Sequence, residues 1–142
     1  MNDFSLDSRL ESDSFPVTDL PLCQVRLMND ARFIWLVLIP RRPGIREAFE
    51  LSTEDQAQLW REATALGQAM KAAVQGDKLN LATLGNVVAQ LHLHVVVRKT
   101  DDAAWPAPVW GHGKARPYDM DSLAAMRDMI LAQIQSLSLT AN

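Results

Sequence analysis

The chain has 142 residues, of which 48% are hydrophobic and 22% charged, and its formal net charge is -3 with histidine neutral. A chain of this length buries roughly two thirds of the surface that its unfolded form exposes, so it is expected to fold without disulfides or a structural metal. The single cysteine, Cys23, excludes the secreted disulfide scaffolds and favours a cytoplasmic location. Because Asp and Glu outnumber Lys and Arg by 17 to 14, long nucleic acids are not expected partners.

The ends and the apolar runs of the chain give no sign of a membrane protein. The longest apolar run, residues 33–39, is far shorter than the roughly 20 apolar residues that span a bilayer. The N-terminus is acidic and lacks the basic and apolar regions of a secretion signal. We therefore interpret residues 1–142 as a single domain, with residues 1–18 as a loose N-terminal lead.

Two segments predict a β-hairpin near the N-terminus. Residues 22–28 alternate polar and apolar side chains, residues 29–32 supply a turn, and residues 33–39 form the apolar run. Pro40 and the Pro43-Gly44 pair end the second strand, since proline cannot donate to a sheet ladder.

A helix is expected to begin at Ser52, an N-cap residue that forms a weak capping box with Asp55. Gly76 is placed to end it. Between them, apolar residues recur at spacings of four and three, which is typical of a helix packed on a sheet; they are Leu59, Ala63, Leu66, Met70 and Ala73.

The second half of the chain predicts two further strands and a second helix. Residues 78–84 and 91–97 read as a hairpin around a Gly85-Asn86 turn, and residues 119–137 carry another helical stripe. Strands and helices in separate runs favour an α+β fold with a largely antiparallel sheet and two main helices.

Two of the three histidines lie in the run Gln90-Leu91-His92-Leu93-His94. On a strand, Gln90, His92 and His94 would share one face while the leucines pack into the core. Imidazole, with an ordinary pKa near 6.5, suits nucleophilic attack and proton transfer at neutral pH. These residues are therefore the candidates for chemistry.

Two other interpretations of the histidine pair remain open. The rings could be ordinary polar residues on an exposed strand face. They could also supply two of the three protein ligands that a zinc enzyme commonly needs, with the third from His112 or a carboxylate. Asp77 is the only acidic residue between Glu62 and His94, and this shortage disfavours a metal.

The histidine run resembles the signature of the histidine triad (HIT) family, in which three histidines alternate with apolar residues, and Gln90 stands in the place of the first. Gly85-Asn86 resembles the family's upstream Gly-Gln pair. Residues 39–42 resemble its strand-ending Ile-Pro-Lys segment, and Trp105-Pro106 resembles its Trp-Pro. These features extend from residue 39 to residue 110, about half of the chain.

The resemblance implies an HIT-like dimer that binds a small nucleotide and attacks its α-phosphate with the middle histidine, here His92, without a cofactor or metal. His94 would then bind phosphate oxygens, and Gln90 would orient a phosphate or the neighbouring ring. Asn80 is a candidate for hydrogen bonds to ribose or phosphate, or else a solvated strand residue.

The turn before the histidines also enters the site that the resemblance implies. Backbone N–H groups of Gly85, Asn86 and Val87 would cradle the phosphate oxygens. Val87 stands where many members of the family carry a hydroxyl that helps the leaving group. This departure tilts the expected substrates toward nucleoside polyphosphates, with phosphoramidates as the other class.

The expected activity is that of a nucleotide hydrolase or nucleotidyl transferase. The alternative is a nucleotide-binding module without turnover, because Gln90 cannot titrate; an HxH metalloprotein is a third hypothesis. The apolar stripe from Leu59 to Ala73 and the strands beside it are expected to form a two-fold interface. Trp105 and Trp110 either stack on a base or anchor a long loop.

Overall fold

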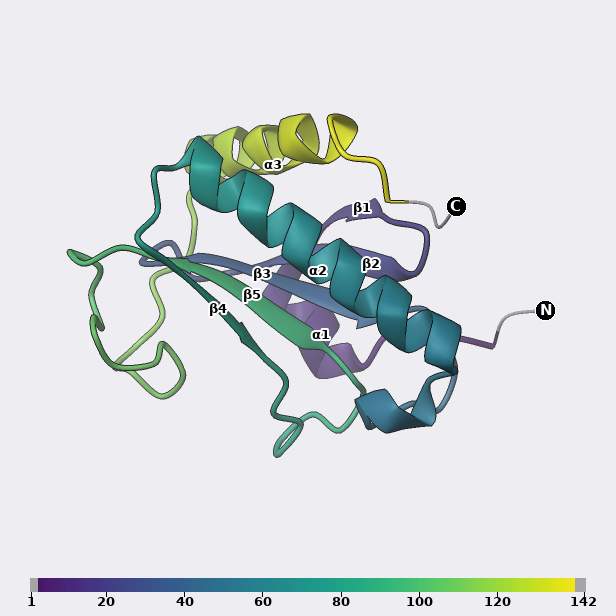
Figure 1. The fold of residues 1–142 in the computed structure, drawn as a ribbon. Coiled ribbons are helices and arrows are strands. Elements are labelled where there is room, and N and C mark those ends of the chain that lie inside the picture. Colours follow the sequence, from purple (N-terminus) through teal and green to yellow (C-terminus); the bar gives the residue numbers. More distant parts are fainter. Residues whose placement is uncertain (1–2, 140–142) are drawn as a thin grey trace.

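The computed structural model describes residues 3–139 and contains three α-helices, a 3-10 helix and five strands (Figure 1). The helices are α1 (Ser8–Asp13), α2 (Thr53–Ala73) and α3 (Met120–Gln135), with η1 (Ala48–Glu50) before α2. The strands are β1 (Ser14–Asp19), β2 (Cys23–Met28), β3 (Ile34–Pro40), β4 (Lys78–Ala82) and β5 (Leu93–Arg98). The α+β class is confirmed.

The strands form one sheet in the order β1-β2-β3-β5-β4, and all neighbours are antiparallel. Both predicted hairpins are present, β2 with β3 and β4 with β5. Strand β5 lies between β3 and β4, so the second hairpin adds to the first and places the histidine segment in the interior of the sheet.

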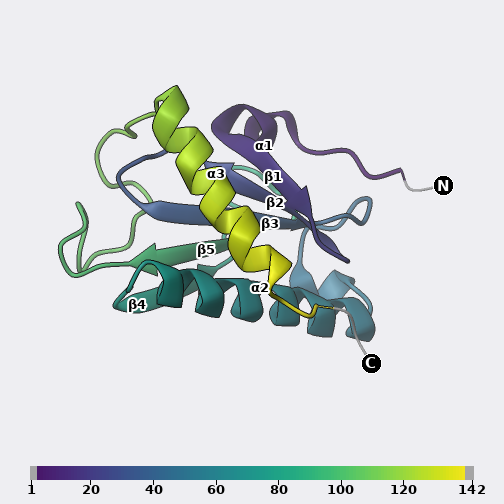
Figure 2. The ribbon, with the colours of Figure 1, turned by 90° about the horizontal axis from the view of Figure 1, so that it is seen from above.

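Helices α2 and α3 lie across one face of the sheet, as Figure 2 shows from above. The side chain of Ser52 accepts a hydrogen bond from Asp55 N–H, as expected of the N-cap, and α2 ends at Ala73. The predicted stripe packs against the chain's own sheet: Leu59, Ala63, Leu66 and Met70 are all buried in the main core. Ala73, the last residue of the stripe, is exposed, and the two-fold interface expected from the stripe and the strands beside it stays a prediction.

The N-terminal segment differs from the expected loose lead. Residues 8–13 form α1 and residues 14–19 form β1, an edge strand paired with β2. The side chain of Asp7 caps α1 by accepting from Arg9 N–H at 2.8 Å. Phe4 and Leu6 pack in a small cluster around Leu10 on the second face of the sheet. The segment is fixed by a cap and by apolar burial.

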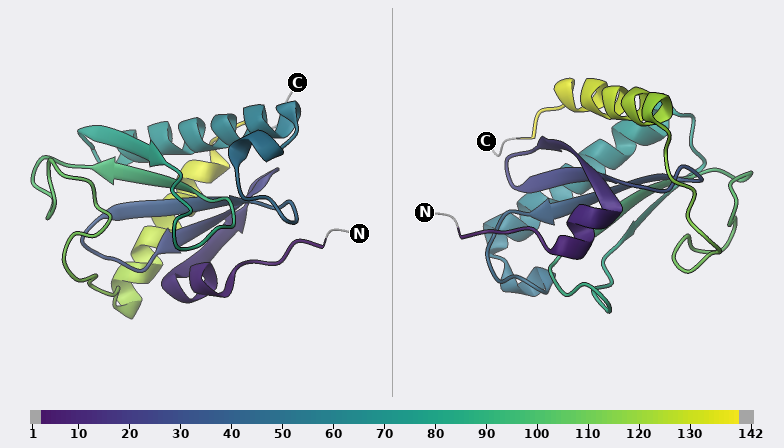
Figure 3. Two further views of the ribbon diagram at one scale, coloured as in Figure 1. Left: turned by 90° about the horizontal axis from the view of Figure 1, so that it is seen from below. Right: turned by 180° about the vertical axis from the view of Figure 1, so that it is seen from behind.

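This second face is covered by loops and by the N-terminal segment instead of long helices. Figure 3 (left) looks onto it, with α1, residues 83–92 and residues 99–118 in view. The candidate site lies on this side of the sheet.

Candidate functional site

A cavity of about 380 Å³ opens on the second face of the sheet. The histidines His92 and His94 line it, together with the loop residues Gly85, Asn86 and Val87. The structure thus brings five of the predicted site residues to one cavity.

Both histidines are buried, which contradicts the interpretation of the pair as exposed surface residues. The exposed fraction is 6% for His92 and 5% for His94. Only His94 lies within β5, opposite Val37 of β3, while His92 precedes the first residue of the strand. The loops and the N-terminal segment cover the two histidines, which the sequence pattern placed on an exposed strand face.

The ring of His92 is held in one tautomer by the backbone. Its Nδ1 lies 2.6 Å from the carbonyl oxygen of Gln90. A carbonyl oxygen can only accept a hydrogen bond, so Nδ1 carries the proton when the ring is neutral. The other nitrogen, Nε2, then keeps its lone pair and has the electronic form of a nucleophile or base.

The ring of His94 is held in the opposite tautomer. The indole Nε1–H of Trp35 donates to His94 Nδ1 at 2.9 Å, so the proton of the neutral ring lies on Nε2. Burial, and after it the nearby His92, lower the pKa of His94 to about 3. At neutral pH His94 is therefore an uncharged hydrogen-bond donor through Nε2–H.

The two rings pack edge to face, with centroids 5.0 Å apart. Trp110 also packs edge to face on His94, at 5.2 Å, and on Trp35, at 5.9 Å. Trp110 thus lines the cavity as well as anchoring its loop, while Trp105 lies outside it beside Arg98. The arrangement supplies a fixed lone pair beside a fixed donor, which is what attack at phosphorus with stabilisation of an oxygen requires.

The turn before the histidines is shaped by Gly85, whose φ of +79° lies in the left-handed region that glycine adopts without strain. The turn brings Asn86 and Val87 to the cavity, and the side chain of Val87 is largely exposed. Residues 83–92 join β4 to β5, and the two strands pair antiparallel from Lys78 opposite Arg98 to Ala82 opposite His94.

Gln90 does not line the cavity with the histidines, and the expected common face of Gln90, His92 and His94 is wrong. Its Oε1 accepts from Asp7 N–H and its Nε2 donates to the Ser5 carbonyl, each at 2.8 Å. Strand β5 begins after this residue, so the alternation assumed for Gln90 does not apply.

Asn80 lies on β4, outside the cavity. Its Oδ1 accepts from Arg98 Nη1 at 3.1 Å, and Arg98 forms a buried ion pair of 2.7 Å with Asp102. This pairing lowers the pKa of Asp102 to about 2. In this position Asn80 supports the Arg98 ion pair.

The cavity also includes residues that the sequence pattern did not suggest. Trp35 comes from β3, and Leu10 and Asp13 come from α1. Among the described residues that line it, none is Lys or Arg, and Asp13 is the one carboxylic acid. A neighbouring cavity of about 380 Å³ shares the walls formed by Asp13 and Trp35 and is lined further by Arg32 and His112.

A metal site finds little support in this arrangement. His112 lines the neighbouring cavity instead of the one that holds His92 and His94. Across residues 3–139, no three His, Cys, Asp or Glu side chains are grouped as metal ligands. In the same part of the chain, no helix is both long and apolar enough to cross a membrane.

Comparison with known proteins identifies the family. The HIT domain model matches residues 9–101, more than half of the chain. The chain belongs to the histidine triad family.

Three solved structures share the fold over nearly the whole chain. A histidine triad protein of Sinorhizobium meliloti 1021 is 45% identical, with a TM-score of 0.91 over 94% of this chain and 98% of that one. One from Marinobacter aquaeolei VT8 is 42% identical, with a TM-score of 0.92 over 95% and 98%. One from Bradyrhizobium japonicum is 42% identical, with a TM-score of 0.90 over 92% and 98%. Comparison with curated proteins gives no match.

Proposed function

We propose that this protein is a nucleotide hydrolase or nucleotidyl transferase in which His92 attacks the α-phosphate of a bound nucleotide. The observation that carries the proposal is the pair of opposite tautomers. His92 has its proton on Nδ1 and His94 has its proton on Nε2. One ring is thereby prepared to attack and the other to donate.

The reaction proceeds by two displacements at phosphorus. The lone pair on His92 Nε2 forms a phosphorus–nitrogen bond as the bond to the leaving group breaks, and that group departs with the electron pair. His94 donates its Nε2–H to a phosphate oxygen, where negative charge is concentrated. Water, or another acceptor hydroxyl, then displaces His92, restores its lone pair and takes the nucleotidyl group.

The loop at residues 85–87 supports the same placement of the phosphate. Gly85, Asn86 and Val87 share the cavity with His92, and a loop with glycine at positive φ allows backbone N–H groups to approach an anion closely. The adjoining cavity beyond Trp35 and Asp13 provides room for the rest of a nucleotide.

The charges of the cavity bear on which phosphate compound is bound. A polyphosphate chain carries several negative charges, and no Lys or Arg among the described lining residues pairs with them. Asp13, an exposed carboxylate that lines the cavity, would repel such a chain. These charges favour phosphoramidates and other singly charged α-phosphates over the nucleoside polyphosphates that Val87 alone suggests.

The test is turnover compared with binding in one preparation. Nucleoside phosphoramidates and polyphosphates of each base are supplied to the protein, and product release and ligand affinity are measured together. Turnover that disappears in His92→Ala supports the proposal. Saturable binding without any turnover would instead identify a nucleotide-binding module.

We also propose that two copies of the chain associate through the surface of α2 and β4. Strand β4 is an edge of the sheet. Beside it, Trp60 is 60% exposed and borders an apolar groove of about 260 Å³ that Leu59 and Leu91 also line. Edge strands and exposed aromatic side chains are covered in symmetric dimers.

A cytoplasmic location fits the free thiol of Cys23, which is buried in the core.

A further inference from the structure

The carboxamide of Gln90 holds the N-terminal segment as a neighbouring strand would. It accepts from Asp7 N–H and donates to the Ser5 carbonyl, both at 2.8 Å. A carboxamide presents one acceptor and one donor in a plane, so a single side chain satisfies two backbone groups of an adjacent segment. Arg9 adds a second connection, because its Nη1 donates to the Val87 carbonyl at 2.9 Å.

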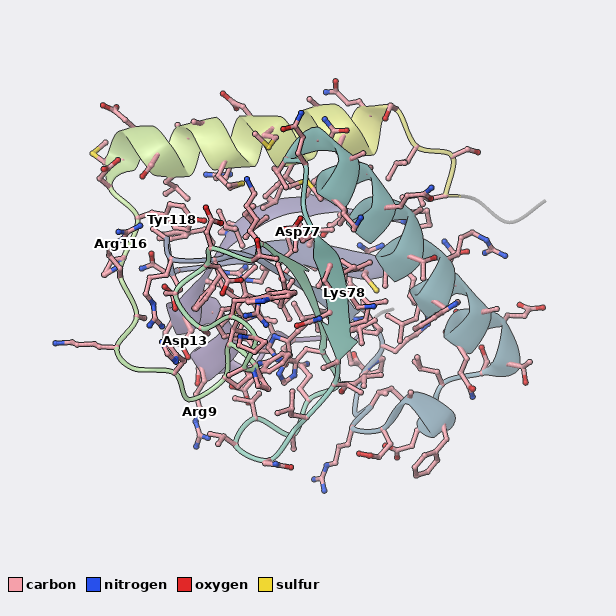
Figure 4. The ribbon with its side chains drawn as sticks, turned by 60° about the vertical axis from the view of Figure 1, so that its left-hand side comes forward. Arg9, Asp13, Asp77, Lys78, Arg116 and Tyr118 are labelled. Atoms are coloured by element: carbon pink, nitrogen blue, oxygen red, sulfur yellow. The ribbon has the colours of Figure 1, made fainter. Side chains whose placement is uncertain are left out.

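The residue held in this way sets the position of α1. Asp7 is the N-cap of α1, and its carboxylate accepts from Arg9 N–H at 2.8 Å. From α1, Leu10 and Asp13 enter the lining of the cavity that contains His92. Figure 4 shows Arg9 and Asp13 on the side of the molecule where the loop of residues 83–92 lies.

Gln90 also contacts the candidate nucleophile directly. Its backbone carbonyl is the acceptor for His92 Nδ1, at 2.6 Å. One residue thus fixes the ring of His92 through its backbone and the N-terminal segment through its side chain. Replacement of the side chain leaves the carbonyl in place, which separates the two roles experimentally.

We propose that Gln90 is a positioning residue that, with Arg9, holds residues 3–13 as a wall of the cavity, so that the wall limits access to His92 and selects the ligand. The ligand selection rests on the proposed function; the control of access does not. The carboxylate of Asp13 on this wall disfavours polyanionic leaving groups. Without the Gln90 side chain, the wall opens and this discrimination weakens.

The access part is tested by acylation of histidine with diethyl pyrocarbonate, which reacts with an unprotonated ring nitrogen. Modification of His92 and of the exposed His112 is followed by peptide mass spectrometry in the same sample, with His112 as the internal reference. Loss of two hydrogen bonds should raise the relative rate at His92 about 10-fold in Gln90→Ala. Arg9→Ala should raise it in the same direction, and Gln135→Ala, a surface change at the end of α3, should leave it unchanged.

Hydrogen exchange checks that a faster acylation of His92 comes from opening of residues 3–13. Peptides covering residues 3–13 should exchange faster in Gln90→Ala, while peptides from α2 keep the wild-type rate. An unchanged acylation rate at His92, or unchanged exchange in residues 3–13, would overturn the proposal. Faster exchange throughout the protein would also overturn it, because the side chain would then support general stability.

The ligand part is tested by steady-state kinetics with one phosphoramidate and one polyphosphate. In Gln90→Ala, KM for the phosphoramidate should rise about 10-fold with kcat within about threefold, and the preference over the polyphosphate should shrink. A fall in kcat at constant KM would overturn the proposal, because Gln90 would then act in the chemistry. If the wild-type protein binds and turns over no nucleotide, the proposed function fails, and acylation and exchange alone decide the role of the wall.

Discussion

Trp35 donates its indole N–H to Nδ1 of His94 at 2.9 Å, and this contact assigns the proton of the neutral His94 ring to Nε2. The two side chains come from neighbouring strands, β3 and β5. Because His92 is fixed in the other tautomer by a backbone carbonyl, the site owes its division of roles to two different hydrogen-bond partners.

Substitution of Trp35 by phenylalanine should remove the contact that fixes the proton of the neutral His94 ring on Nε2. Trp35→Phe keeps an aromatic ring but removes the donor, so the proton should redistribute between Nδ1 and Nε2, and turnover should fall about 10-fold, the value of one hydrogen bond. Nitrogen-15 shifts of the ring measure the tautomer directly. Trp105→Phe is the control; an unchanged His94 tautomer in Trp35→Phe would contradict the role assigned to Trp35.

The stability of the protein should depend on pH through His94. Its pKa is about 3 in the folded state and near 6.5 when unfolded, so the unfolded chain binds more protons between these values. The free energy of unfolding should therefore fall as pH decreases from 6.5 toward 3, by up to about 1.4 kcal/mol per pH unit from this group. Above pH 6.5 this contribution is constant.

Other groups also titrate in that range, so the measurement is a difference. Urea unfolding of the wild type and of His94→Gln at several pH values isolates the contribution of His94. The gap between the two proteins should change with pH below 6.5. Parallel curves would show that His94 is not held neutral by burial.

A histidine at residue 90, as in the family signature, tests the positioning role of the Gln90 carboxamide. The carboxamide of Gln90 binds two backbone groups of the N-terminal segment, and an imidazole has a different shape and spacing of donor and acceptor. We expect Gln90→His, like Gln90→Ala, to raise KM about 10-fold and to leave kcat within about threefold. A gain in turnover would indicate that a titrating group is missing from the site and that the carboxamide has no positioning role.

The proposed dimer rests on the exposed groove beside Trp60. Light scattering should give the mass of a dimer for the wild type and that of a monomer for Trp60→Glu, because a charge in an apolar interface is costly. Lys114→Glu, on an exposed loop residue, serves as the control. A monomer in the concentrated wild-type protein would reject this assembly.

Local signals in the sequence predicted most of the fold. The alternation over residues 22–28, the apolar run after it and the N-cap at Ser52 each act within a few residues, and each corresponds to an observed element. Helix α1 has only six residues and one buried side chain, Leu10, so it carries no helical periodicity. Its existence depends on the cap at Asp7 and on packing against a sheet formed by later residues.

The site was predictable only in part, because its decisive contacts join distant parts of the chain. The histidines and the turn at Gly85 could be found from a short motif. The partner of His94 is Trp35, 59 residues away, and the partners of the Gln90 side chain are 83 and 85 residues away. Strand register and loop placement decide such pairs, and neither can be read from residue spacing alone.

The central claim is that His92 forms a covalent bond to the α-phosphorus, and the most direct measurement is to trap that bond. The protein is incubated with a nucleotide phosphoramidate labelled at the α-phosphate, quenched in denaturant at high pH, where a phosphorus–nitrogen bond survives, and digested for mass spectrometry. The label should lie on His92, decrease in His94→Ala and be absent in His92→Ala. Turnover should retain configuration at phosphorus, as two in-line displacements require. Inversion of configuration in an active enzyme would show direct attack by water and would contradict the account.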